Sequence, residues 1–182
     1  MATVVTIGNV SKSFPDFSSL GNVPDGSRRL DKCDSSSQQY KDYACNRLWN
    51  IDAHSSFNRN VLTGISDLNE EASKRIAVHD YSDVVSGLTL IEGYLTSTLQ
   101  YVNSHLSYVN SMIGKSSKKD RCCQKNDSLN SYRQVDLDFA KSVSDAKTAI
   151  DTIKASVIDA MDAWQDAEST EADVAERDAV VN

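Results

Sequence analysis

Apolar residues recur as a regular heptad through the last quarter of the chain. The steps between them alternate between four and three residues without a slip. Because an α-helix turns every ~3.6 residues, this repeat keeps one narrow seam on a single face and implies left-handed supercoiling. We therefore predict a helix at about 131–178, opened by a capping box at Ser131 and Gln134, whose seam is covered by another helix. The seam contains Phe139, Val143, Ala146, Ile150, Ile153, Val157, Ala160, Trp164, Ala167 and Val174, and Glu171 interrupts it.

A second apolar seam predicts a helix at about 82–113. One additional four-residue step lies inside its heptad, and such a stutter locally unwinds a supercoil. Gly87 and Gly93 would each cost about 1 kcal/mol relative to alanine in a helix interior. We expect a close approach of another helix to compensate for them. The seam contains Val84, Leu88, Ile91, Leu95, Leu99, Val102, Leu106, Val109 and Ile113.

Weaker helical periodicity precedes these two segments. An irregular step in the apolar pattern lies between Ile51 and Phe57. The pattern predicts helices at about 37–60 and 66–78, either separate or joined as one kinked helix at the junction between them. Gly64 favours a break there, and Asp67 three residues before Glu70 is typical of a helix start. Residues 79–82 form a second joint, and residues 114–130 form a polar connector before the last helix.

Residues 1–36 show no helical period. They contain both prolines of the chain, Pro15 and Pro24, and isolated apolar residues among serines and glycines. We interpret them as an extended arm that lies along a neighbouring subunit, rather than as a loose tail, and residues 4–7 could add a strand to another chain's sheet. After Gly114 the chain has neither glycine nor proline, whereas a β protein needs turn residues every ~8–12 positions. The predicted fold class is all-α: an elongated helical bundle or coiled coil over residues 37–182, with a non-helical N-terminal arm.

The residues within the heptad indicate what the seam packs against. Half of its d positions are alanine, which favours close antiparallel or mixed packing over a standalone zipper. Trp164 is too large for a two-helix seam at ~8–10 Å separation, so it either caps a wider core or contacts a partner. The last helix outreaches its predecessor by about 24 Å at 1.5 Å per residue. An intramolecular four-helix bundle and an intermolecular seam both fit this spacing, and the length mismatch favours several chains.

Charge is distributed unevenly along a chain of net charge −7. Residues 134–182 carry twelve acidic and four basic residues, whereas residues 115–133 carry six basic and two acidic ones. One short basic segment in an acidic chain disfavours duplex nucleic acid as a partner, because that partner requires a broad basic face. The opposite signs suggest instead that the connector of one copy meets the acidic helix of another, which predicts salt-sensitive assembly.

Candidate chemical sites are few. Cys122 and Cys123 are adjacent and lie among basic residues that lower thiol pKa, so they are candidates for redox chemistry or crosslinking, with two inert loop thiols as the alternative. Cys33 and Cys45 could clip the arm to the helical body if oxidised. The histidines His54, His79 and His105 are scattered; His79 and Asp83 form at most half of a metal site. We predict no metal site, no cofactor and no catalytic residue.

These features predict a non-enzymatic structural subunit of a multi-chain assembly, such as a virion, a phage tail or neck, or a surface filament. Its expected partners are other copies of itself or other subunits of that assembly. The alternative is a soluble helical adaptor or chaperone-like protein that binds a client helix. Neither a signal peptide nor a membrane-spanning segment is apparent, so we expect synthesis in the cytoplasm, with incorporation into a virion or an extracellular assembly as a further possibility.

Overall fold

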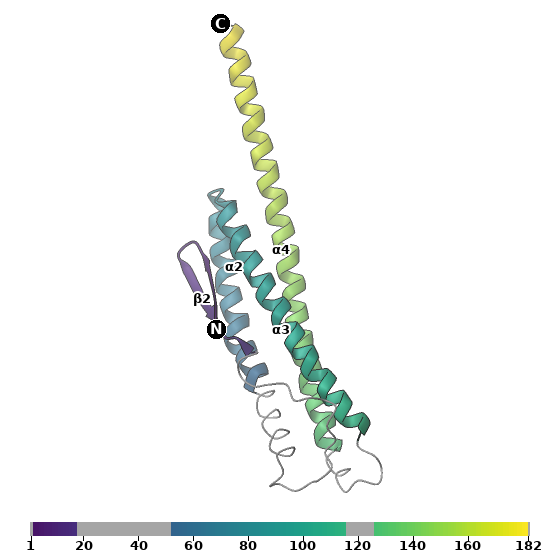
Figure 1. Cartoon of the computed structure of the whole chain (residues 1–182). Helices are drawn as coiled ribbons and strands as arrows, with labels where there is room; N and C mark the ends of the chain where they lie inside the picture. Colours follow the sequence, from purple (N-terminus) through teal and green to yellow (C-terminus); the bar gives the residue numbers. More distant parts are fainter. Residues whose placement is uncertain (1, 18–51, 116–125, 182) are drawn as a thin grey trace.

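The computed structural model describes residues 2–17, 52–115 and 126–181, which form long packed helices and one N-terminal β-hairpin (Figure 1). The predicted all-α class with a non-helical N-terminus is confirmed. The elements in chain order are β1 (Thr3–Ile7), β2 (Val10–Phe14), η2 (Phe57–Val61), α2 (Leu62–Ala77), α3 (Tyr81–Lys115) and α4 (Asn126–Val181).

The first described helix is continuous from residue 52 to Ala77. The two predicted segments are therefore joined, and the alternative of separate helices with a break at Gly64 and a start near residue 66 is wrong. The π-helical segment η2 lies within this helix and widens one turn without ending it. Phe57 and Val61 of this segment are fully buried. The first part of the predicted 37–60 helix lies outside the described residues.

A tight turn joins α2 to α3 at the predicted joint. The N–H of His79 donates to the carbonyl of Ile76 (3.0 Å), and the N–H of Asp80 donates to the carbonyl of Arg75 (2.9 Å). These two bonds, with His79 in the left-handed region at φ 61°, form a Schellman motif that ends α2. The chain consequently reverses within a few residues, and α3 runs back along α2.

Helices α3 and α4 form a long antiparallel pair. They contain 35 and 56 residues, which correspond to about 52 and 84 Å at 1.5 Å per residue. The capping box predicted at Ser131 is wrong, because α4 already begins at Asn126. Once a helix packs on a partner, polar residues extend it at little cost, so the helix start need not coincide with the first apolar residue.

The N-terminal arm is in part a β-hairpin that packs on the chain's own helices. Strands β1 and β2 pair antiparallel, with Ile7 opposite Val10, and Gly8 adopts the positive φ of 56° that the two-residue turn needs. Residues 4–7 therefore pair with residues 10–13 of their own hairpin. Residues 18–36 of the predicted arm lie outside the described residues.

Carboxylates from the helices hold the tip of the hairpin. The N–H of Gly8 donates to Asp83 Oδ2 (2.7 Å), and the N–H of Asn9 donates to Glu71 Oε1 (3.3 Å). The bond from Asn9, with further help from Arg75, lowers the pKa of Glu71. The hairpin is thus fixed by backbone hydrogen bonds at its tip and by apolar packing along its inner face.

Two helical glycines make room for the hairpin. A Cβ at Gly64 would lie 2.8 Å from the Phe14 ring, and a Cβ at Gly87 would collide with the side chain of Ile7. The prediction that Gly87 and Gly93 accommodate a neighbouring helix is therefore wrong. Gly87 accommodates the hairpin, and a Cβ at Gly93 would have no atom of residues 2–17, 52–115 or 126–181 within 4 Å.

Candidate assembly interface

The heptad seam of α4 is covered by the chain's own elements as far as Trp164. Phe139, Val143, Ile150 and Val157 are buried, and the intervening members of the seam pack partly buried against the same core. Helix α3 is the main partner of α4, and residues of the first helical segment join it: the Phe57 and Phe139 ring centroids lie 5.5 Å apart. This stretch of the seam is intramolecular.

Trp164 marks the end of this packed body. Its ring stacks on His79 with centroids 3.6 Å apart and planes 7° apart. The tryptophan thus packs on the turn between α2 and α3 and caps the core. We call the hairpin and the helices up to Trp164 the body, and residues 165–181 of α4 the projecting segment.

The projecting segment extends alone beyond the body (Figure 1), and every one of its residues is exposed. At 1.5 Å per residue it is about 25 Å long. The seam continues on it at the seven-residue spacing through Ala167, Val174 and Val181, of which the two valines are 43 % and 86 % exposed. The projecting segment therefore carries an apolar stripe that no described residue covers.

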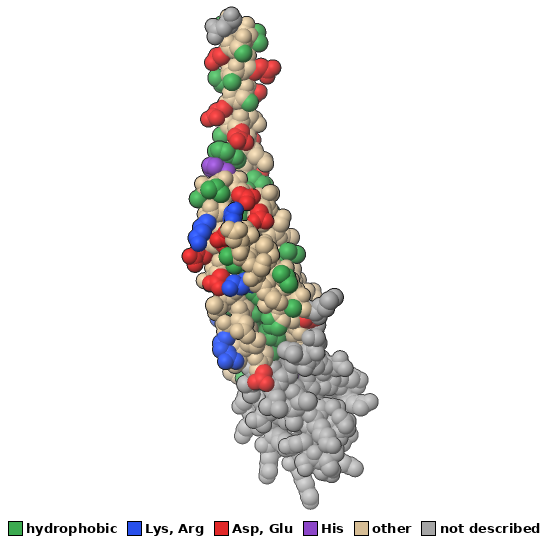
Figure 2. Space-filling view, turned by 90° about the vertical axis from the view of Figure 1, so that its left-hand side faces the viewer, with side chains coloured by type: hydrophobic (Ala, Val, Ile, Leu, Met, Phe, Trp, Pro, Cys, Tyr) green, Lys and Arg blue, Asp and Glu red, His purple; other side chains and the backbone are tan. Residues whose placement is uncertain are grey.

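Acidic residues surround this stripe. The projecting segment contains six acidic residues and one basic residue, and Figure 2 shows acidic side chains along this end with hydrophobic ones between them. Negative charge near a helix C-terminus is unfavourable, because the carbonyl end of the helix dipole is itself negative. The last turn of α4 has no basic residue to offset it.

The seam of α3 is a strict heptad that includes two polar residues. Thr98 and His105 are 5 % and 2 % exposed, whereas Leu99 and Leu106 are only partly buried. The predicted stutter is therefore wrong, because the buried seam position in this turn is Thr98 and not Leu99. The side chain of Ile113 lies outside the described part. The buried seam is Val84, Leu88, Ile91, Leu95, Thr98, Val102, His105 and Val109.

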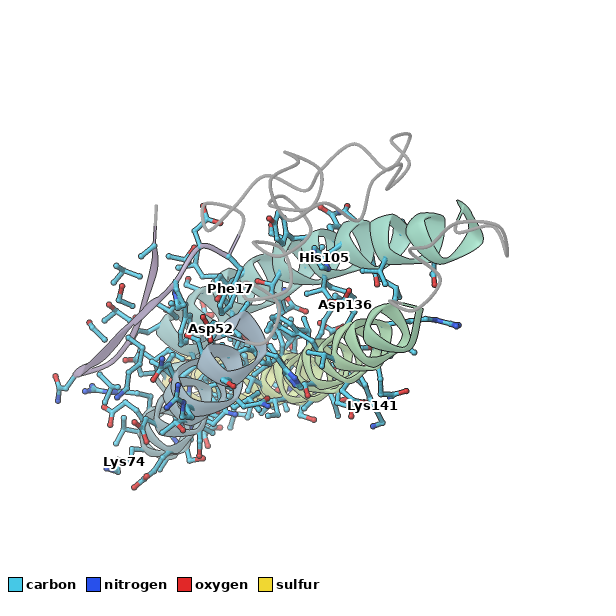
Figure 3. All side chains as sticks on the ribbon, turned by 90° about the horizontal axis from the view of Figure 1, so that it is seen from below. Phe17, Asp52, Lys74, His105, Asp136 and Lys141 are labelled. Carbon is cyan, nitrogen blue, oxygen red and sulfur yellow. The ribbon has the colours of Figure 1, made fainter. Side chains whose placement is uncertain are left out.

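His105 meets a carboxylate of α4 at the same depth. Its Nδ1 lies 2.7 Å from Oδ2 of Asp136, which is fully buried, and the two side chains point toward each other between the helices (Figure 3). Asp136 lies seven residues before Val143 and three before Phe139, so it occupies a position of the α4 seam. The other carboxylate oxygen, Oδ1, is buried and has no hydrogen-bond partner in the described part of the chain. We call His105 and Asp136 the register pair.

Sequence reasoning missed this pair because it selected seam positions by apolarity. The signal was present: the α4 heptad extrapolates one step back to Asp136. The strict 4-3 spacing of α3 passes through His105 in the same way.

His54 lies beside the register pair. Its ring stacks on Phe139 with centroids 5.2 Å apart and planes 14° apart. Burial lowers the pKa of His54, against a smaller opposing effect from the carboxylates of Asp138 and Asp136. His54, His105 and Asp136 come from the first described helix, from α3 and from α4, so each of the three contributes one titratable side chain at this end of the body.

A groove of about 560 Å³ lies between the hairpin and the outer face of α3. Tyr94 forms part of its wall, and its hydroxyl donates to the carbonyl of Pro15 (2.7 Å). Asp16, Leu90 and Tyr101 also line it. The groove is open, and its walls are both polar and aromatic.

The remaining predicted sites have structural roles or cannot be placed. His79 stacks on Trp164 and hydrogen-bonds Tyr81, while Asp83 accepts from the hairpin, so the two do not form half of a metal site. Within residues 2–17, 52–115 and 126–181, no three His, Cys, Asp or Glu side chains are grouped to hold a metal ion. Cys33, Cys45, Cys122 and Cys123 lie outside the described residues.

Comparison with family models, curated proteins and solved structures found no match to this chain. In the described parts of the chain, no helix combines the length and the apolar character that crossing a membrane requires. Any assignment of function therefore has to come from the geometry of the molecule itself.

Proposed function

We propose that this protein is a non-enzymatic structural subunit of a multi-chain assembly and that the projecting segment of α4 is its assembly interface. The observation that carries the proposal is the continuation of the α4 seam past the body as a single exposed helix. A lone helix of this length is marginal in water, because most helical stability in proteins comes from packing an apolar face. A partner that covers the apolar stripe would stabilise the projecting segment as a helix.

Charge favours a second copy of this chain as the partner. Two projecting segments laid side by side would bring two strongly acidic surfaces together, which disfavours a symmetric pair. Residues 115–125 instead contain five basic residues and one acidic residue, and the helix ends that they join lie at the opposite end of the molecule (Figure 1). Contact between these unlike ends is head-to-tail, and such contacts build open filaments or rings.

The setting in which this assembly works is a further part of the proposal. A virion, a phage tail or neck, or a surface filament all use elongated helical subunits. That choice rests on general architecture, which is shared by many unrelated proteins.

A second candidate function is a helical adaptor that binds a client segment. The groove between the hairpin and α3 favours it, because an open groove with aromatic walls fits an extended or helical peptide. An adaptor of this kind is monomeric without its client, so the oligomeric state separates the two candidates.

The test compares two double variants of the full chain by light scattering after size exclusion. Val174→Asp with Val181→Asp places two charges on the stripe. Ser169→Asp with Ala172→Asp places the same charges on the opposite side of the same helix. We expect the stripe variant to fall to a monomer of 20.0 kDa, while the control variant keeps the mass of the parent assembly.

Two results would overturn the proposal. A parent protein of 20.0 kDa at all concentrations shows no self-assembly and favours the adaptor. Equal masses for the two double variants place the contact away from the stripe.

A further inference from the structure

The register of α4 against α3 is weakly specified by apolar packing alone. Both seams repeat every seven residues, so a shift by one heptad again places apolar residues opposite apolar residues. Small residues at Ala146 and Ala160 impose little shape on the contact. The apolar seams therefore favour the antiparallel pair without fixing how far one helix extends past the other.

The register pair distinguishes one register from the others. His105 and Asp136 meet at 2.7 Å, and both are almost completely buried. A shift by one heptad moves them apart by about 10 Å along the helix axis and leaves a carboxylate in an apolar interface. A buried polar group without its hydrogen-bond partner is destabilising, and single polar residues at seam positions are known to fix the register of coiled coils.

Other polar contacts between the two helices are weaker determinants. Lys154 and Glu92 form an ion pair at 2.7 Å, but their side chains remain 24 % and 22 % exposed. Partly solvated pairs contribute less than buried ones because water competes for both charges. The buried pair thus dominates the choice of register.

We propose that the register pair is a lock that fixes α4 against α3 and thereby sets the length of the projecting segment. A shift by one heptad would change that length by about 10 Å out of about 25 Å. It would also move Trp164 away from His79. Trp164 lies about 42 Å along α4 from Asp136. The lock belongs to the fold of the single chain, so it holds whether or not the projecting segment is an assembly interface.

Trp164 provides a readout far from the lock. In a Trp49→Phe background its fluorescence reports whether the indole is stacked in the body or exposed to water. Replacing the pair by His105→Leu with Asp136→Leu removes the polar contact but preserves an apolar interface. We expect this variant to keep its helix content and to show a second, red-shifted Trp164 population from shifted registers.

Matched variants separate register from general stability. Exchanging the pair, His105→Asp with Asp136→His, restores the contact in the same register and should return Trp164 to a single population. Lys154→Met breaks the partly solvated ion pair with Glu92 and should leave the Trp164 emission unchanged.

If the double leucine variant does not fold, Asp136→Val is compared with the exchanged pair by the same measurement. A red shift in Asp136→Val that the exchange reverses supports the lock. A single unshifted Trp164 population in a folded variant without the pair overturns it, as does failure of the exchange to restore the parent spectrum.

Discussion

His54 carries a half-buried imidazole that stacks on Phe139 at the end of the body. Burial lowers its pKa below the ordinary value of 6.5. A base with a lowered pKa in the folded state binds fewer protons folded than unfolded as the pH falls through 6.5. Its contribution to stability is therefore complete above that pH and declines below it.

We expect the free energy of unfolding to decrease between pH 7.5 and pH 5.5, and to decrease less in His54→Gln. Glutamine keeps a polar side chain but does not titrate, so the other histidines and the carboxylates contribute equally to both proteins. Urea unfolding followed by circular dichroism at the two pH values measures the difference. Identical pH dependence in the two proteins would contradict the expectation.

The sequence predicts the buried seam positions correctly where the residue is apolar. Phe139, Val143 and Ile150 belong to the seam by spacing and by hydrophobicity, and they are buried. Asp136 and His105 belong by spacing alone, and their burial depends on each other across two helices. A single sequence shows the heptad spacing of His105 and Asp136 but not that the two side chains meet. The contact between them was therefore not predictable from the apolar pattern.

At the scale of elements, the hairpin shows how two glycines in similar helical positions serve different purposes. Gly87 lies beneath the hairpin, where a Cβ would collide with Ile7 and lie 3.3 Å from the carbonyl oxygen of Thr6. A Cβ at Gly93 on the same helix would meet none of the described residues within 4 Å. The two positions form a matched pair for substitution.

We expect Gly93→Ala to stabilise the protein by up to about 1 kcal/mol, because alanine is the better helix former. Gly87→Ala gains the same helical propensity but overpacks the hairpin contact, for a net loss of roughly 1 to 2 kcal/mol. Urea unfolding of the two variants and the parent tests both signs. A gain in stability for Gly87→Ala would show that the hairpin is not held on α3 as described.

The elements themselves were predictable to different degrees. Residues 82–113 and 131–178 carry long periodic patterns, and helices α3 and α4 cover both ranges. The continuity of the helix through Gly64 was not predictable, because a glycine ahead of an acidic pair is typical of a helix break, whereas Gly64 is a buried position of α2 beneath Phe14 of the hairpin. The hairpin was read as an unpaired arm because its strands are short and its second strand, Val10–Phe14, alternates only weakly between apolar and polar residues.

At the scale of the whole molecule, the described helices form a rod whose single-helix end is acidic, whereas the segment joining α3 to α4 is basic in sequence. In the proposed assembly, opposite charge at opposite ends would steer copies into head-to-tail contact, and salt would oppose that contact. The apolar stripe would then stabilise the contact, and charge would select its orientation.

This division of tasks predicts the response to salt and to charge reversal. We expect the molar mass of the parent protein to decrease between 0.05 and 0.5 M NaCl, since surface charges are screened beyond about 10 Å at 0.1 M salt. Glu171→Lys with Glu176→Lys in the projecting segment should lower the mass at low salt. Asp159→Lys with Asp162→Lys, the same reversal on the exposed face of α4 within the body, should leave it unchanged. If neither salt nor Glu171→Lys with Glu176→Lys changes the molar mass of the multimer, charge does not orient the contact. The apolar stripe would then remain as the proposed contact.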